Sequence, residues 1–198
     1  MEVRVVISGV RPLLMSNQRS ADPNDPIVQE MQALTRKASK ATAEERRQIS
    51  NLEFRLRIYH DAEIGPYIPG VNFKRCIQDG GKKVKRGKDI QRAIMAKEDK
   101  VPLLYKGPRD FESLLADTSF RHVGFAKTPP RTGSIVQRTR PMFTQWGLDA
   151  VFEVDDEEMD LHDFRSFCQN AAKYGLGDYR PDFGRFEVQS VELASNGK

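Results

Sequence analysis

The densest positive charge in this sequence lies between Lys74 and Arg92, where the only acidic residues are Asp79 and Asp89. The cations of this stretch, called the basic tract below, are Lys74, Arg75, Lys82, Lys83, Lys85, Arg86, Lys88 and Arg92. Such a cluster can neutralise several phosphates, and it gains affinity when counterions are released from a nucleic acid. The alternative interpretation is a solvated helix end, because a helix dipole favours cations at its carboxyl end.

Cations and aromatic residues also alternate between 120 and 143, around the turn sequence TPPRTGS. A groove that binds a single strand combines cations for the phosphates with aromatic rings for the bases. An ordinary hairpin with its aromatic residues in the core is the alternative. The candidate phosphate ligands of this segment are Arg121, Lys127, Arg131, Arg138 and Arg140.

A third candidate is the glycine-rich segment GLGDYRPDFGRF, which runs from Gly175 to Phe186. Glycines let a backbone approach a phosphate closely, and Arg180 and Arg185 supply positive charge. A tight turn between a helix and a strand would need the same glycines. Both interpretations therefore stay open for this segment.

Catalytic and metal-binding patterns are weak in this sequence. Asp22 and Asp25 lie in a turn sequence with prolines, so turn and capping roles explain both residues. The histidines share neither metal-ligand nor catalytic-triad spacing. They are His60, His122 and His162. We therefore predict no catalytic residue, no metal and no cofactor.

The composition is that of an ordinary globular protein. The chain has 198 residues, of which 38% are hydrophobic and 9% aromatic, enough for one core. The net charge of +4 is mild, so the distribution of charge matters more than its sum. Cys76 and Cys168 show no CxxC spacing, which argues against a disulfide framework and indicates a reducing, cytoplasmic compartment. Apolar runs stay far below the roughly 18 residues of a membrane span, so we expect no membrane association.

The apolar patterns predict an α+β protein. Strands are expected over 3–10, 55–58, 66–68, 101–105, 146–154 and 183–193, with 55–58 and 66–68 forming a short hairpin. Helices are expected after Asp25, from the capping box of Thr42 and Glu45, after Pro69, over 89–95 and from Leu161. The helix after Pro69 should bury Phe73, Ile77 and Val84, with Lys82, Lys83, Lys85 and Arg86 at its carboxyl end.

This order predicts one antiparallel sheet backed by helices. We expect a single domain over 1–198, with a helical insertion over 22–56 and a long basic hairpin or loop over 120–143.

Three segments resemble, in the same order, motifs of the RAMP superfamily, the ferredoxin-like (RRM-like) proteins that include backbone subunits of CRISPR effector complexes. The opening strand and the segment RPLLM resemble the family's first strand and the apolar segment that directly follows it. YIPGVNFKRCI is similar to its turn-and-helix motif, and YGLGDYRPDFGRF to its glycine-rich loop. The chain departs from the family pattern at Asn72, Phe73, Arg185 and Phe186. These departures indicate a stand-alone or phage-borne relative rather than a standard CRISPR subunit. A phage-borne relative would act in the cytoplasm of its bacterial host cell.

The resemblance implies a ferredoxin-like fold, a single strand held in a groove, and side-by-side assembly of copies into a homo-oligomer or filament. Our first hypothesis is therefore a non-specific binding protein that coats single-stranded DNA or RNA. The second is a RAMP-type ribonuclease, because members that cut RNA place an acidic residue after the first strand, and Asp22, Asp25 or His60 would lie in that site. The third is a structural or assembly protein whose charges serve subunit contacts.

Overall fold

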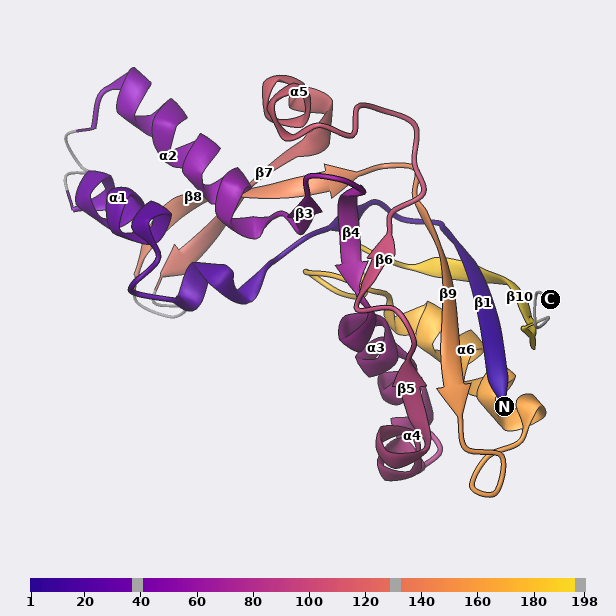
Figure 1. Ribbon diagram of the computed structural model, residues 1–198. Coiled ribbons are helices and arrows are strands. Elements are labelled where there is room, and N and C mark those ends of the chain that lie inside the picture. Colours follow the sequence, from indigo (N-terminus) through magenta and orange to yellow (C-terminus); the bar gives the residue numbers. More distant parts are fainter. Residues whose placement is uncertain (37–40, 129–132, 195–198) are drawn as a thin grey trace. The chain divides into compact units, whose positions relative to one another are not determined.

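The computed structural model describes residues 1–36, 41–128 and 133–194. By its internal contacts the chain separates into two compact units (Figure 1). Unit 1 comprises Met1–Leu13, His60–Gly107 and Phe143–Lys198, and unit 2 comprises Leu14–Tyr59 and Pro108–Met142. The segments predicted as a helical insertion and as a basic hairpin therefore fall almost entirely in unit 2.

Unit 1 is built on a four-stranded antiparallel sheet with the strand order β10-β1-β9-β5. Its strands are β1 (Glu2–Gly9), β5 (Ile94–Ala96), β9 (Gly147–Val154) and β10 (Phe186–Leu193). Alternate residues of β1, namely Val3, Val5 and Ile7, are buried, as expected for a strand with one face on the core. The first strand and the strand after Trp146 are confirmed, whereas the last strand begins later than predicted.

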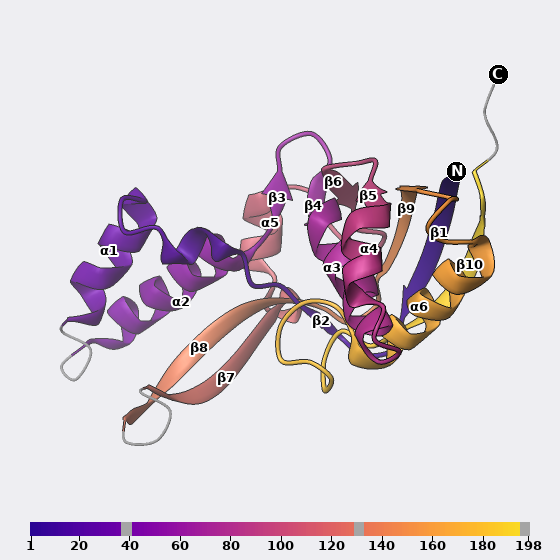
Figure 2. The same cartoon turned by 90° about the horizontal axis from the view of Figure 1, so that it is seen from below.

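Two helices of unit 1, α3 (Gly70–Lys82) and α6 (Leu161–Tyr174), cover one face of this sheet (Figure 2). The ring of Phe152 on β9 lies 5.3 Å from the ring of Phe73 on α3 and 5.9 Å from the ring of Phe164 on α6, measured between centroids. A short helix, α4 (Gly87–Ala93), follows α3 and leads into β5. The core of unit 1 therefore lies between the sheet and the two long helices.

A smaller sheet of unit 1 contains β3 (His60–Asp61), β4 (Gly65–Pro69) and β6 (Lys100–Pro102). The predicted pairing of 55–58 with 66–68 is wrong, because residues 55–57 end the helix α2 (Ala43–Arg57). The alternating sequence RLRI imitates a strand. However, Leu52 and Leu56 are both buried, and residues four apart share one face of a helix.

The helices of unit 2 begin where local capping chemistry predicts. Asp25 caps α1 (Pro26–Thr35), accepting a hydrogen bond from the backbone N–H of Ile27 at 2.8 Å. Thr42 and Glu45 form the predicted capping box of α2, with hydrogen bonds of 3.2 and 2.7 Å. Shorter turns complete the unit: η1 (Gln18–Ala21), α5 (Phe111–Ala116) and η3 (Thr118–Phe120).

The predicted hairpin is confirmed as β7 (Arg121–Thr128) and β8 (Ser134–Phe143). β8 also pairs with β2 (Leu13–Leu14), so these strands form a separate sheet. The α+β class is therefore confirmed, but the described strands form three sheets rather than one. The single-sheet prediction failed because β7 and β8 pair with each other and contact α2 instead of extending the sheet around β1.

Candidate nucleic-acid interface

The basic tract begins on α3 and continues through the turn that joins α3 to α4. The helix stops at Lys82, and the backbone N–H groups of Val84 and Arg86 both donate to the carbonyl of Gly81, at 3.1 and 3.0 Å. Within this turn Lys85 adopts a left-handed φ of 63°. The prediction that Val84 is buried on the helix is therefore wrong, and Lys85 and Arg86 lie beyond the helix end.

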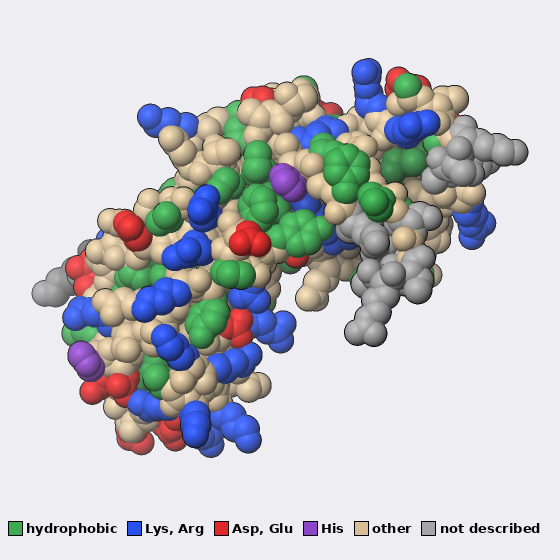
Figure 3. Space-filling view, turned by 180° about the vertical axis from the view of Figure 1, so that it is seen from behind, with side chains coloured by type: hydrophobic (Ala, Val, Ile, Leu, Met, Phe, Trp, Pro, Cys, Tyr) green, Lys and Arg blue, Asp and Glu red, His purple; other side chains and the backbone are tan. Residues whose placement is uncertain are grey.

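Three lysines of this turn and of α4 are exposed to solvent: Lys83, Lys85 and Lys88. None of the three side chains forms a hydrogen bond or an ion pair with another residue that the structure describes. Lysine and arginine side chains gather on the face of unit 1 that Figure 3 shows. We call Lys83, Lys85 and Lys88 the lysine group.

Other cations of the basic tract have structural partners. Arg86 pairs with Asp89 at 3.0 Å and with Asp163 on α6, and it lies over the ring of Phe167. The hydrogen bonds that Arg86 donates to the carboxylate of Asp89, and next to that of Asp163, raise the pKa of Arg86 above its ordinary value. Lys74 donates to the carbonyl of Gln91 at 2.9 Å, which ties α3 to α4. Arg86 and Lys74 therefore hold elements of unit 1 together.

Three further candidates of unit 1 lie on its surface. Arg75 and Arg185 are exposed, and Arg92 is exposed while pairing with Asp89 at 3.5 Å. The structure does not bring Arg75 or Arg185 into contact with the lysine group.

The glycine-rich segment forms a closed loop between α6 and β10. Gly175 ends α6, as predicted, and the backbone N–H of Leu176 donates to the carbonyl of Gly184 at 2.9 Å. A Cβ on Gly184 would lie only 1.7 Å from the carbonyl oxygen of Leu176. The loop can close only with a glycine at position 184, so a phosphate contact is not needed to explain this residue.

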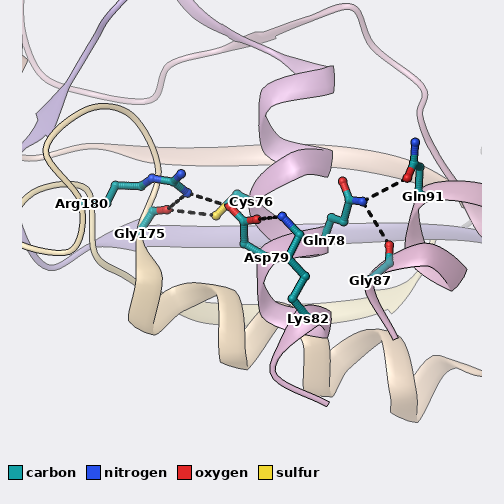
Figure 4. A network of polar contacts seen from close by, with 8 residues as sticks. All are labelled: Cys76, Gln78, Asp79, Lys82, Gly87, Gln91, Gly175 and Arg180. Carbon is teal, nitrogen blue, oxygen red and sulfur yellow. Dashed lines mark hydrogen bonds and ion pairs between the residues drawn. The ribbon is translucent and has the colours of Figure 1, made fainter. Parts of the chain in front are cut away.

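Asp79 on α3 joins this loop to the end of the helix (Figure 4). Its carboxylate accepts a hydrogen bond from Lys82 at 2.6 Å and another from Arg180 of the loop at 3.1 Å. Arg180 also donates to the carbonyl of Gly175, at 3.2 Å, as does the thiol of Cys76, at 3.2 Å. Partial burial opposes ionisation of Asp79, but the hydrogen bonds from Lys82 and Arg180 hold its pKa below the ordinary value.

An open hollow of about 630 Å³ lies beside this network, and we call it the tyrosine hollow. Its lining residues are Asp79, Lys82, Tyr174, Gly177, Asp178, Tyr179, Arg180 and Pro181. Tyr174 and Tyr179 are each 41% exposed. Neither tyrosine is among the candidates predicted from the sequence. The signal that could have identified them is their position beside the loop glycines and Arg180.

The arginines of the hairpin serve unit 2 itself. Arg121 donates to Ser50 and Asn51 on α2, at 3.0 and 2.9 Å, and burial lowers its pKa. Arg138 pairs with Glu53, a buried carboxylate, at 3.0 Å. Arg140 is buried. Contacts within unit 2 and burial therefore account for these three arginines without a nucleic-acid ligand.

The two remaining candidates of this segment are Lys127 and Arg131. Lys127 belongs to β7, but its side chain is outside the description, and Arg131 lies outside the described residues.

The residues of the ribonuclease hypothesis also have structural explanations. Asp25 is buried, caps α1 and pairs with Arg19. Asp22 accepts a hydrogen bond from the backbone of Asn24 at 2.9 Å, and His60 lies half-buried in β3. Among the described residues, no three His, Cys, Asp or Glu side chains are grouped so that they could hold a metal ion. Along the same ranges, no helix combines the length and apolar character needed to cross a membrane.

A comparison with models of known protein families matches none of them, and a comparison with curated proteins gives no match either. The RAMP resemblance therefore stays a hypothesis that rests on the three sequence motifs.

Proposed function

We propose that this protein binds single-stranded nucleic acid without sequence specificity through unit 1, and that copies of it assemble along the strand. The observation that carries the proposal is the lysine group, three exposed cations without a partner among the described residues. Such cations are available to phosphates. Because contacts to phosphate carry no base information, the lysine group supports binding to DNA and RNA alike.

The order of elements in unit 1 supports a ferredoxin-like assignment. When α4 and the smaller sheet of β3, β4 and β6 are set aside, β1, α3, β5, β9, α6 and β10 follow the pattern β-α-β-β-α-β along the chain. In the sheet, the first strand of this pattern lies between the third and the fourth. This arrangement supports the RAMP hypothesis, because the proteins of that family are ferredoxin-like.

The proposal is tested by the salt dependence of binding to a fluorescently labelled single-stranded oligonucleotide. In the site variant, Lys83, Lys85 and Lys88 are replaced by glutamine. If all three bind phosphates, the slope of log affinity against log salt should become shallower by about 2, because each contact to a single strand contributes about 0.7.

A matched control variant carries the changes Arg36→Gln, Arg47→Gln and Lys106→Gln. These cations are also exposed, and the control lowers the net charge of +4 by the same three units as the site variant. The control should keep the slope of the unaltered protein. Equal slopes of log affinity against log salt for the two variants would show that the lysine group is not part of the interface. Failure of the unaltered protein to bind at low salt would refute the proposal.

One observation favours the assembly-protein hypothesis as a second candidate. Three apolar side chains of the hairpin are strongly exposed: Val123 at 43%, Phe125 at 72% and Ile135 at 67%. Exposed apolar surface of this kind often marks a contact with another protein. Size-exclusion chromatography with and without an oligonucleotide separates the candidates. Association that needs the strand supports coating, whereas association without the strand supports assembly.

A further inference from the structure

The charges that line the tyrosine hollow are balanced, unlike those of the adjacent lysine group. The two cations of the lining, Lys82 and Arg180, are matched in number by Asp79 and Asp178. Both cations also donate to the same carboxylate, that of Asp79. A phosphate gains little from cations that an internal carboxylate already neutralises. The hollow is therefore better suited to an uncharged part of a ligand.

Two of the uncharged residues that line the hollow are aromatic. Tyr174 is the last residue of α6 and Tyr179 lies in the loop, so tyrosines from two separate backbone segments line one hollow. Each tyrosine leaves 41% of its surface in solvent. Aromatic rings beside a basic surface are the usual stacking partners of bases in single strands.

The backbone of Tyr179 is held in one conformation before any ligand binds. Its φ of 51° lies in the left-handed region, which is uncommon for residues other than glycine. Two hydrogen bonds hold it there: its N–H donates to Asp178 at 3.0 Å, and its carbonyl accepts from the N–H of Phe183 at 3.2 Å. The ring centroids of Tyr179 and Phe183 are 6.5 Å apart. A loop whose backbone is preorganised loses less entropy when a ligand binds.

From these contacts we infer that the tyrosine hollow binds one unpaired nucleobase, while the lysine group binds phosphates of the same strand. The inference rests on the proposed function and adds to it the part of the strand that the hollow recognises. A base inside a duplex is stacked and paired, so it cannot enter the hollow without leaving the stack. The hollow therefore selects single strands over duplexes that carry the same phosphates.

The test compares a single-stranded oligonucleotide with an abasic strand of the same length, which keeps the phosphates and lacks the bases. The unaltered protein should bind the strand with bases about tenfold more tightly than the abasic strand, because tenfold corresponds to about 1.4 kcal/mol, which is within the range for stacking of one base on an aromatic side chain. The double variant Tyr174→Leu, Tyr179→Leu should bind both strands with the affinity that the unaltered protein shows for the abasic one. Its salt slope should stay unchanged, since the lysine group is intact.

Two further variants keep the result specific. The double variant Tyr174→Phe, Tyr179→Phe retains the rings and should retain the tenfold ratio. Phe125→Leu removes an exposed aromatic ring of the hairpin and should leave the ratio unchanged. If Phe125→Leu abolishes the ratio instead, bases stack on the hairpin and the inference is wrong.

The outcomes for the unaltered protein separate this inference from the proposed function. Equal, tight binding of both strands would overturn the base site while leaving the proposed function standing. Failure to bind either strand would overturn both. Should the leucine variant not fold, photocrosslinking of a strand carrying 5-iodouracil to the unaltered protein decides the question. Crosslinks at Tyr174 or Tyr179 support the inference, and crosslinks only elsewhere contradict it.

Discussion

Replacing Gly80 with alanine should destabilise the packing of α3 against α6. A Cβ on Gly80 would lie 2.2 Å from the carbonyl oxygen of Phe167 and 2.6 Å from the backbone nitrogen of Ala171, both on α6. These are backbone atoms of a helix, so they cannot rotate away as the end of a flexible side chain can. The two helices would have to move apart to accept the extra methyl group.

The sign of the effect distinguishes this site from an ordinary helical glycine. At an exposed position, glycine to alanine stabilises a helix by about 1 kcal/mol. Overpacking of a tight contact costs about 1–3 kcal/mol, and more where rigid atoms clash. We expect the clash at Gly80 to outweigh the propensity gain, leaving a net loss of about 2 kcal/mol. Because α3 carries Lys82 and α6 carries Tyr174, the tyrosine hollow should be disturbed as well.

Urea unfolding followed by tryptophan fluorescence measures this loss in unit 1, where Trp146 is buried and is the single tryptophan of the sequence. Gly87→Ala is the matched control, because its Cβ would come closest to the Cγ of Lys82, at 2.7 Å, and the nearest backbone atoms would lie 3.7 Å away, so a shift of the Lys82 side chain can relieve the contact. The control should change the unfolding free energy by no more than about 0.5 kcal/mol. A Gly80→Ala variant as stable as the unaltered protein would refute the close crossing of α3 and α6.

Three other predictions follow from buried and paired groups. Glu53→Ala should lower the free energy of unfolding of unit 2 by about 3 kcal/mol, because it leaves Arg138 and the backbone N–H of Thr139 without their buried partner. Thermal unfolding followed by circular dichroism measures this loss. A loss no larger than that of Glu53→Gln would contradict the prediction. The hydrogen bond from Lys100 lowers the pKa of Asp61 from 3.8 to about 2. A lowered pKa in the folded state stabilises the protein above the unfolded-state pKa, and this contribution is lost as the pH falls from about 4 towards 2. Asp61→Asn should therefore lose less stability over that range than the unaltered protein, and an identical acid titration would count against the ion pair. Burial raises the pKa of both cysteine thiols, that of Cys76 to about 12. A thiol reagent should therefore modify them slowly at neutral pH and quickly in denaturant, and rapid reaction with the native protein would show that they are accessible.

Several elements could be predicted because their signals lie within a few residues. Asp25 caps α1 through the N–H two residues later, and Thr42 and Glu45 exchange hydrogen bonds within one turn. Gly175 ends α6 through its own backbone conformation. The wrong strand over 55–58 shows the limit of such signals. Its short alternation fitted a strand as well as the end of a helix, and burial against the rest of unit 2 decided between them.

Sequence alone located the positive charge of this protein, because charge density is a property of neighbouring residues in the chain. It could not tell which cations are available to a ligand. Arg86 forms an ion pair with Asp163 on α6, and Arg138 forms one with Glu53 on α2. Both carboxylates lie far from their arginines along the sequence. Folding likewise brought Tyr174 and Tyr179 beside Lys82 to form the tyrosine hollow. Only the tertiary structure decided these points, since ion pairing, burial and cavity lining depend on contacts between distant parts of the chain.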